Sequence, residues 1–190
     1  PCHCAQTRNR VNFEKIPLMD LKKQYQQIQP EIDLKLKQIF TECSFIGGVE
    51  KESFELEYAK LMGAKHCIGV ANGTDALFLI MKAMGLGKND KVITVANSFI
   101  ASSETISAVG ATPVFVDVDE KNFLIDLEKL EILLSTKAQT ENIKAIVLVH
   151  LYGQIVDMPR LLKITDKYNI KVIEDCAQSH LASIDGKKSG

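Results

Sequence analysis

Apolar residues recur along the chain with two different periods, and the change between them falls near residue 66. Over residues 18–43 the apolar positions are three or four apart, which predicts a helix, and Pro30 predicts a break that begins a second helix. A further helix is expected over about 50–62 and should end at Gly63. These ranges together predict an N-terminal helical segment over residues 16–62.

Beyond residue 66, short runs rich in Val and Ile alternate with helical stretches. The expected strands cover residues 67–71, 91–95, 113–117, 145–149 and 171–174. The expected helices cover about 73–84, 99–109, 126–135 and 158–169, with Asp126 and Asp157 as N-caps and Gly85 and Gly110 as C-terminal stops. Such alternation predicts an α/β fold with a mainly parallel sheet, right-handed crossovers and helices on both faces.

Composition narrows the class of protein. The 190 residues are 46% hydrophobic and carry a net charge of −1, which is typical of a globular domain and gives no electrostatic basis for binding nucleic acid or an anionic membrane. No apolar run approaches the roughly 20 residues of a membrane span. The cysteines are odd in number and irregularly spaced, which favours reduced thiols in a cytoplasmic protein: Cys2, Cys4, Cys43, Cys67 and Cys176.

The two ends of the sequence lead us to expect a fragment. The opening residues of the segment 1–15 show neither a helix nor a strand period, and we interpret this segment as a disordered leader. Cys2, His3 and Cys4 are potential metal ligands, but so short a run makes a poor tetrahedral site without a second cluster, so no metal is predicted. At the other end the chain stops in the turn-like sequence before Gly190.

Candidate ligand-binding residues follow the expected strands. Gly73 and Thr74 would open a helix whose free amides and positive dipole end favour a phosphate group, while the alternative is a plain cap by Asn72 with Asp75. Phe99 follows the next strand and could cover a flat ligand or be a core residue.

Three further strand ends carry polar side chains. Asp117 and Asp119 could serve metal or acid–base chemistry, although turn formation is the simpler interpretation. His150 and Tyr152 could line a pocket or hydrogen-bond within their loop.

The last expected strand ends in Glu174 and Asp175, followed by Gln178 and His180. A carboxylate at the mouth of a central strand is partly desolvated and favours a cationic partner, such as a protonated pyridine nitrogen. A local capping role for Asp175 is the alternative. Glu174 should point to the opposite face because strand side chains alternate.

Taken together, these residues resemble the DegT/StrS family of sugar aminotransferases, which have the fold-type I pyridoxal 5'-phosphate (PLP) architecture. The resemblance extends from about Ile16 to Gly190, and the order and spacing of its motifs make it specific. The matching stretches are I-P-L-M-D-L-K-K-Q-Y, F-I-G-G-V-E, G-V-A-N-G-T-D-A-L, A-N-S-F-I-A-S, G-A-T-P-V-F-V-D-V-D, V-H-L-Y-G-Q and V-I-E-D-C-A-Q-S-H.

The resemblance implies a role for each matching position. Gly73 and Thr74 would bind the cofactor phosphate, and Phe99 would stack on the pyridine ring. Asp175 would pair with the ring nitrogen and keep it protonated, so that the ring accepts electrons from a substrate carbanion. Gln178 would contact the side of the ring that carries the hydroxyl group. Residues 63–190 would then be a partial PLP-binding large domain.

The resemblance also implies an activity for a longer protein. That protein would be a homodimer that moves an amino group, with glutamate as donor, onto a keto group of a nucleotide-linked deoxysugar. The family's Schiff-base lysine lies beyond the last residue of this chain, so the 190 residues alone are expected to be inactive. The chain also has Leu181 where the family usually has glycine.

Three alternatives stay open at this point. A PLP-dependent sugar dehydratase or deoxygenase on the same scaffold would have a histidine in place of the lysine. A catalytically inactive binding or regulatory homologue would keep the fold without the chemistry. An unrelated nucleotide-binding α/β domain would bind NAD or ATP, although the expected glycine fingerprints are missing from the sequence.

Overall fold

The structure is a computed structural model that describes residues 17–138 and 140–190. Residues 1–15, expected to be a disordered leader, lie outside the described residues, as do Cys2, His3 and Cys4. The chain divides into two compact units, residues 1–52 and residues 53–190. Among the described residues, no helix combines the length and the apolar character needed to cross a membrane.

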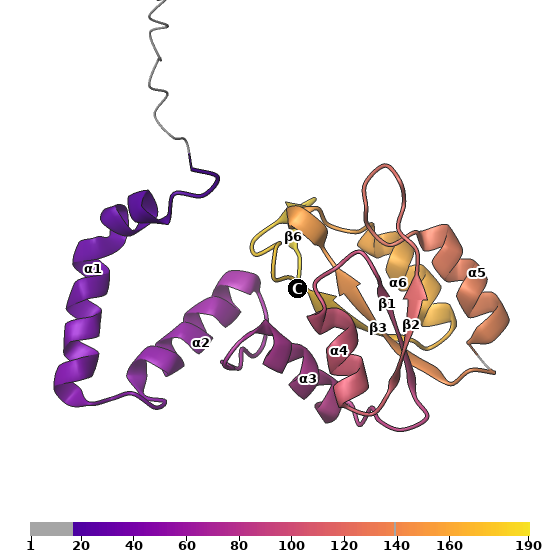
Figure 1. The fold of residues 1–190 in the computed structure, drawn as a ribbon, viewed down its shortest axis with the longest axis horizontal. Coiled ribbons are helices and arrows are strands. Elements are labelled where there is room, and N and C mark those ends of the chain that lie inside the picture. The colour runs from indigo at the N-terminus through magenta and orange to yellow at the C-terminus, as the bar shows by residue number, and fades with distance from the viewer. Residues whose placement is uncertain (1–16, 139) are drawn as a thin grey trace, which may run out of the picture. The chain divides into compact units, whose positions relative to one another are not determined.

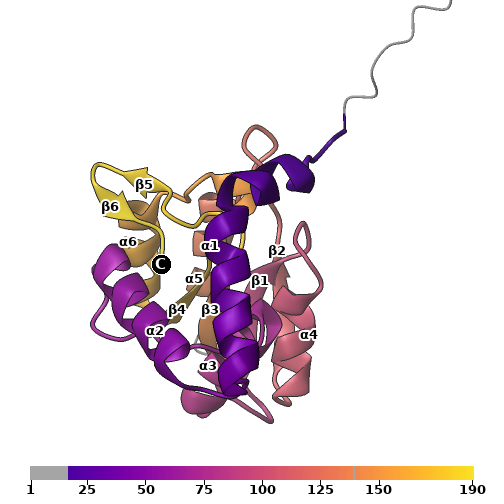
Figure 2. The same ribbon diagram turned by 90° about the vertical axis from the view of Figure 1, so that its left-hand side faces the viewer.

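The described part of the first unit is dominated by helix α1 (Leu21–Glu42), which is capped by the Asp20 carboxylate. Pro30 lies inside α1, so the expected break into two helices is wrong. A proline in a helix interior removes one backbone hydrogen bond and bends the helix, and the residues on both sides here keep the helical conformation. The axis of α1 changes direction along its length in both views (Figures 1 and 2).

The second helix, α2 (Val49–Met62), runs across the boundary between the two units in sequence and ends before Gly63, which has a φ of +72°. The positive φ is the conformation that favours glycine and stops the helix. The expected helix over about 50–62 and its stop are therefore confirmed.

The second unit is built on a four-stranded sheet in the order β2-β1-β3-β4, in which every pair is parallel. The strands are β1 (Lys91–Val95), β2 (Thr112–Val116), β3 (Ile143–Val149) and β4 (Lys171–Asp175). The predicted parallel sheet is confirmed, with strand bounds within two residues of those expected from the sequence.

One predicted strand is wrong. Residues 67–71 form no strand, and within the described residues no neighbouring strand pairs with them. Ile68 is 78% exposed and Val70 is 40% exposed. A run of β-branched residues forms a strand only where a neighbouring strand accepts its hydrogen bonds and one of its faces is packed. Residues 67–71 have neither among the described residues.

Helices cover both faces of the sheet (Figure 1). On one face, α3 (Gly73–Ala83) and α4 (Ala101–Ala108) bury a cluster that includes Met81, Ile106, Val92 and Val147. On the other, α5 (Leu127–Lys137) and α6 (Met158–Lys167) bury a cluster that includes Leu130, Leu161, Ile93 and Ile146. Neighbouring strand residues belong to opposite clusters because strand side chains alternate between faces.

The predicted helix boundaries follow from local hydrogen bonds. The Asp126 carboxylate accepts from the amides of the first turn of α5, and the Asp157 carboxylate does the same for α6. Gly85 and Gly110 follow α3 and α4 with positive φ values. These N-caps and C-terminal stops are confirmed, because the residue types that satisfy helix ends are few.

Short elements complete the carboxyl-terminal part. A single 3-10 turn, η1 (Leu151–Gly153), follows β3. A small antiparallel hairpin joins β5 (Ser183–Ile184) to β6 (Lys187–Lys188), visible in yellow in Figure 2. Lys187 and Lys188 are exposed, and the Lys188 ammonium group also donates to the carbonyl of Leu61 near the end of α2.

The amino ends of the strands are held by polar contacts that we call the amino-edge network, made of Asp90, Lys91, Glu141 and Asn142. The Asp90 Oδ1 atom accepts from the Asn142 side chain at 3.0 Å, and the Lys91 ammonium group lies 2.8 Å from Glu141. The Lys91 amide also donates to the Asn142 carbonyl. The start of β1 is thereby joined to the loop that leads into β3.

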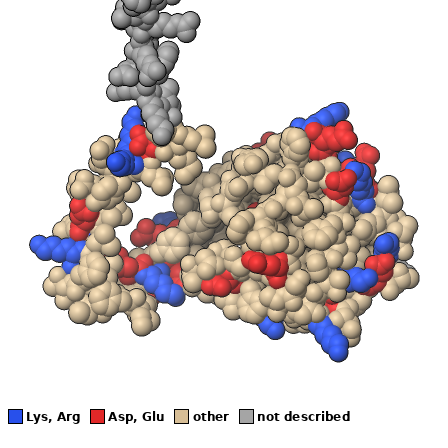
Figure 3. Space-filling view, viewed as in Figure 1, with Lys and Arg blue, Asp and Glu red and all other residues tan. Residues whose placement is uncertain are grey.

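Charge is spread over the surface of the second unit. Figure 3 shows acidic and basic side chains interspersed over the drawn face. The described residues on that face form no patch of a single sign.

Candidate cofactor-binding site

The order of the strands places a topological switch point at the carboxyl ends of β1 and β3. These two strands are neighbours, but the chain leaves β1 towards β2 through α4 and leaves β3 towards β4 through α6, on the opposite face. Open parallel sheets bind ligands at such a switch point, outside the carboxyl ends of the strands. The candidate site residues must therefore be located relative to this edge.

Helix α3 directs its amino terminus towards the same edge. The opposite end of α3, at Gly85 and Leu86, lines a cavity with Asp90, Lys144 and Lys171, which lie at the amino ends of the strands. An 11-residue helix is about 16 Å long and a five-residue strand is about as long. The first residues of α3 therefore lie level with the carboxyl ends of the strands.

The amino terminus of α3 keeps free hydrogen-bond donors. Asn72 is the N-cap, since its Oδ1 atom accepts from the Asp75 amide at 2.8 Å. Within the described residues, the amides of Gly73 and Thr74 and the Thr74 hydroxyl have no acceptor. A Cβ placed on Gly73 would meet nothing within 4 Å, so the space in front of it is open.

Asp75 could have repelled a phosphate at this position. Its Oδ2 atom instead lies 3.2 Å from the Asn72 side-chain amide, which turns the carboxylate back towards the cap. The cap and the phosphate-site interpretations are therefore compatible, because the cap uses the third amide of the helix and leaves the first two.

Phe99 lies in the turn between β1 and α4 and is 72% exposed. The alternative that it is a core residue is wrong. The turn is held by a 2.9 Å hydrogen bond between the hydroxyls of Ser98 and Ser102, and Ser102 is buried. An aromatic ring of this size is exposed at the carboxyl edge and is available to a flat ligand.

Asp175 ends β4 and is partly buried. Its carbonyl accepts from the His150 amide, and its Oδ1 atom accepts from the Ala177 amide at 3.1 Å. The local capping role is therefore real, but it uses only one carboxylate oxygen. Within the described residues, Oδ2 has no hydrogen-bond donor and no cation beside it.

Gln178 is exposed in the loop after β4, and its Oε1 atom accepts from the Tyr152 amide at 2.8 Å. His180, further along the same loop, is 2.6 Å from the Tyr58 hydroxyl through Nδ1. Leu181 has a φ of +64°, a left-handed conformation that glycine adopts at lower cost. Leu181, which stands where the family usually has glycine, therefore keeps the left-handed turn at the cost of backbone strain.

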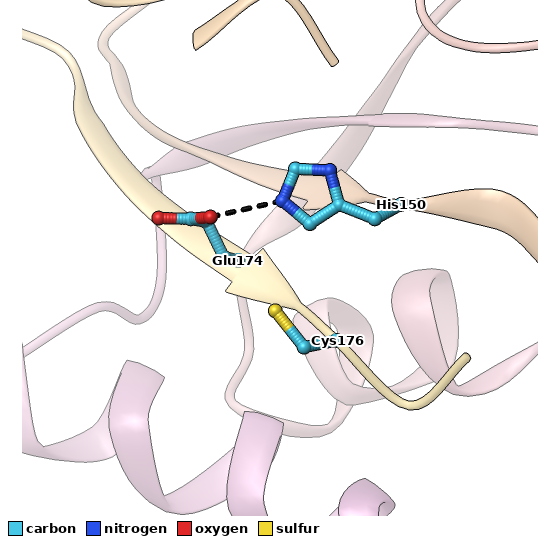
Figure 4. A group of neighbouring side chains, drawn as sticks. All are labelled: His150, Glu174 and Cys176. Carbon is cyan, nitrogen blue, oxygen red and sulfur yellow. Dashed lines mark hydrogen bonds and ion pairs between the residues drawn. The ribbon is translucent and has the colours of Figure 1, made fainter. Parts of the chain in front are cut away.

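His150, Glu174 and Cys176 gather behind Asp175, with their potential ligand atoms all within 4.8 Å of one another (Figure 4). The fully buried His150 accepts from the Val156 amide at Nδ1, so its hydrogen is on Nε2, which lies 2.9 Å from Glu174. Burial raises the pKa of the Cys176 thiol. The hydrogen on His150 Nε2 and the raised pKa of Cys176 fit a hydrogen-bonded His150–Glu174 pair beside a thiol. They do not fit a set of metal ligands, which would need a free imidazole nitrogen and a thiolate.

The environment of Glu174 sets its charge. The hydrogen bond from His150 lowers the pKa of this carboxyl, burial opposes that change, and the Gly190 amide, 3.0 Å away, lowers it further. The net effect favours the ionised form of Glu174. The pairing of His150 with the loop confirms the interpretation that it hydrogen-bonds locally.

The carboxylate pair after β2 is explained by turn formation. Asp117 accepts from the Val118 amide and pairs with Lys129 at 3.1 Å. Asp119 accepts from the amides of Lys121 and Asn122. The contacts that the sequence did not reveal are those between distant positions, such as Tyr58 with His180 and Glu174 with Gly190, because no local pattern encodes them.

Comparison with known proteins agrees with this geometry. Residues 26–190 match the model of the DegT/DnrJ/EryC1/StrS aminotransferase family. The chain is 45% identical over 175 residues to a dTDP-3-amino-3,6-dideoxy-alpha-D-galactopyranose transaminase of Aneurinibacillus thermoaerophilus, covering 92% of this chain and 47% of that one. It is 41% identical over 175 residues to a "pleiotropic regulatory protein" of Geobacillus stearothermophilus, covering 92% and 46%.

A solved structure has the same fold. The crystal structure of NtdA from Bacillus subtilis with bound cofactor PMP aligns with a TM-score of 0.83 and 31% identity, covering 94% of this chain and 40% of that one. The parallel sheet, the covering helices and the family match together define a fold-type I PLP-dependent transferase scaffold. This chain belongs to the DegT/DnrJ/EryC1/StrS aminotransferase family and spans about half the length of the curated relatives it matches.

Proposed function

We propose that this chain is the N-terminal part of a PLP-dependent aminotransferase that acts on a nucleotide-linked keto-deoxysugar, with glutamate as the amino donor. The observation that carries the proposal is the set of unused polar groups at one sheet edge. Gly73 and Thr74 offer free donors, and Asp175 offers a free carboxylate oxygen. The similarity to the dTDP-amino sugar transaminase of Aneurinibacillus thermoaerophilus supports the reaction, and the similarity to PMP-bound NtdA supports the cofactor.

These groups fit the proposed cofactor. The amides of Gly73 and Thr74 and the Thr74 hydroxyl would hold its phosphate, and the exposed Phe99 ring would cover one face of its pyridine ring. Asp175 Oδ2 would accept a hydrogen bond from the protonated ring nitrogen and so keep that nitrogen protonated, while Gln178 would contact the ring hydroxyl. When bound, PLP supplies an electron sink for the carbanion at the amine-bearing carbon.

The remaining parts of the proposal concern the longer protein. We propose that the Schiff-base lysine follows this chain in the sequence, that residues 63–190 are a partial PLP-binding large domain, and that the 190 residues alone do not transaminate. We also propose that the longer protein is a homodimer and that it is cytoplasmic, where the free thiols of Cys43, Cys67 and Cys176 would stay reduced.

The test is transamination by the full-length protein, measured as 2-oxoglutarate formed from glutamate in the presence of PLP and a nucleotide-linked keto-sugar. Asp175→Asn should lower turnover by about 100-fold or more, because the amide cannot hold the ring proton, and should change PLP affinity far less. Asp166→Asn, on the exposed side of α6, is the matched control and should leave both unchanged. Near-normal turnover in Asp175→Asn would show that the carboxylate has been misassigned.

A regulatory homologue is the second candidate, because a relative that covers 92% of this chain is named a pleiotropic regulatory protein. Such a protein would keep the fold without needing the chemistry. If the full-length protein shows no visible absorption band with PLP and no 2-oxoglutarate formation, the regulatory function is favoured.

A further inference from the structure

We propose that the backbone amide of Tyr152 is a positioning group that fixes the direction of the Gln178 side chain, so that Gln178 can only donate hydrogen bonds to a ligand at this edge. The inference rests on the proposed function and deepens it. It assigns the matching ligand group as a hydrogen-bond acceptor, an oxyanion on the cofactor ring.

The orientation of the Gln178 amide follows from its partner. A backbone N–H can only donate, so the side-chain atom 2.8 Å from the Tyr152 nitrogen must be the oxygen. The two N–H groups of Gln178 then point elsewhere. Within the described part of the chain they have no acceptor, and the residue is exposed. Gln178 therefore presents two donors three residues after the free carboxylate oxygen of Asp175.

The Tyr152 amide is held in place by an unusual backbone conformation. Tyr152 has a φ of +54° and a ψ of +24°, a left-handed conformation that is unfavourable for a residue other than glycine. Its side chain is 86% exposed and buries little apolar surface to offset that cost. In this conformation the Tyr152 amide donates a hydrogen bond to Gln178 Oε1.

The neighbouring residues keep the two loops in contact. Gly153 has a φ of +85°, and a Cβ there would lie 3.3 Å from the Gln178 carbonyl oxygen, so the backbones approach closely. On the other side, the His150 amide donates to the Asp175 carbonyl, and the His150 side chain pairs with Glu174. Residues 150–153 are thus fixed against β4 and its loop at each end.

The consequence is a site with a defined polarity. Asp175 Oδ2 is an anionic acceptor and Gln178 Nε2 is a donor, so the fitting ligand carries a protonated nitrogen and an acceptor oxygen on one ring. A glutamine free to turn over its amide would accept a hydroxyl as readily as an oxyanion. The Tyr152 amide removes that freedom and favours the oxyanion.

The test uses full-length protein loaded with PLP, and the readout is the pH at which the visible absorption band of the bound cofactor changes. Gln178→Leu removes the donor, so the ring oxyanion is less stabilised and holds its neighbouring proton more tightly. That pH should rise by about one unit, and the PLP dissociation constant should rise about 10-fold. Gln178→Glu keeps the bond to Tyr152 but faces the ring oxygen with a second carboxylate oxygen, and should weaken binding further.

Variants of Tyr152 and Gly153 separate positioning from simple loop stability. Tyr152→Gly keeps the N–H and relieves the left-handed conformation, so it should leave the pH transition unchanged. Gly153→Ala keeps the Tyr152 N–H but places a Cβ 3.3 Å from the Gln178 carbonyl oxygen at a left-handed φ of +85°, so it should push the two loops apart and weaken the bond from the Tyr152 amide to Gln178. It should raise the transition in the direction that Gln178→Leu does, and combining the two should add nothing further. Far-ultraviolet circular dichroism and thermal melting check that the variant is folded.

Each outcome decides one of the two proposals. Absence of PLP binding by the wild-type protein would overturn the proposed function and, with it, this inference. PLP binding with a pH transition that is the same in Gln178→Leu would overturn the inference alone. Additive shifts in the Gly153→Ala, Gln178→Leu double variant would show that the contact between the two loops does not act through Gln178 and would also overturn it.

Discussion

The Nε2 atom of His150 lies 2.9 Å from the Oε2 atom of Glu174, and this bond joins the loop after β3 to the end of β4. Glu174 precedes Asp175, and the two side chains point to opposite faces of the strand. Glu174 therefore anchors the end of β4 on one face, while Asp175 on the other face is directed towards the proposed ligand. The imidazole is fully buried and its second nitrogen is occupied by the Val156 amide.

Replacing Glu174 should change how stability depends on pH. The fold lowers the pKa of this carboxyl below its usual 4.5, chiefly through the His150 hydrogen bond. A lowered folded pKa means that the stabilisation is present above the unfolded pKa and is lost as pH falls through the folded value. Glu174→Gln should therefore be less stable than the wild type at neutral pH and lose less stability on acidification, as measured by urea unfolding.

The control for that prediction is Glu131→Gln, an exposed position on α5. It should follow the wild-type pH profile. Parallel profiles for the wild type and Glu174→Gln would contradict the role assigned to the His150–Glu174 pair.

Phe99→Ala should weaken PLP binding by the full-length protein without lowering its melting temperature. The ring is 72% exposed, so its removal leaves no cavity, while stacking on a flat ligand contributes about 0.5–1.5 kcal/mol beyond area burial. An increase of about 10-fold in the PLP dissociation constant is expected from fluorescence titration. Phe123→Ala, at another exposed phenylalanine, should leave PLP affinity unchanged.

Thr74→Val tests the phosphate site at the start of α3. The hydroxyl has no acceptor in the described part of the chain, so its loss should matter only when a ligand is bound. PLP binding should weaken by about 10-fold, whereas binding of pyridoxal, which lacks the phosphate, should not change. Thr136→Val, whose hydroxyl bonds to backbone carbonyls in an exposed helix turn, is the matched control. Equal losses for PLP and pyridoxal would place the phosphate elsewhere.

Leu130→Ala should destabilise the second unit by about 2–5 kcal/mol, because the side chain is fully buried between α5 and the sheet and its truncation leaves a cavity. Ile132→Ala, in the same helix but 64% exposed, should change the free energy of unfolding by no more than about 0.5 kcal/mol. Urea unfolding of both variants measures the difference. Similar values for the two would show that the face of α5 has been misassigned.

The sequence predicted most of the second unit because its signals are local. Helix caps at Asp126 and Asp157, glycine stops at Gly85 and Gly110, and Val/Ile runs each specify an element from its own residues. Two predictions were wrong where a local signal competed with something else. Pro30 bends α1 without ending it, and residues 67–71 have strand composition without a neighbouring strand among the described residues.

The candidate site was predicted in part. The positions of Gly73, Thr74, Phe99, Asp175 and Gln178 at one sheet edge follow from the alternation of strands and helices, while their roles stay predictions. What the sequence could not reveal is how these groups are already engaged. The bond from the Tyr152 amide to Gln178 and the turning of Asp75 towards Asn72 depend on side-chain directions and on residues 26 apart in the chain.

The amino-edge network lies at the end of the sheet opposite the proposed site, and this separation has an engineering consequence. Asp90, Lys91, Glu141 and Asn142 hold the start of the strands without touching the loops that follow them. We therefore expect that the loops after β1, β3 and β4 can be exchanged between relatives as a set, because the contacts at the far end hold the start of the strands. The scaffold is divided into a part that can be kept constant and a part that can be varied.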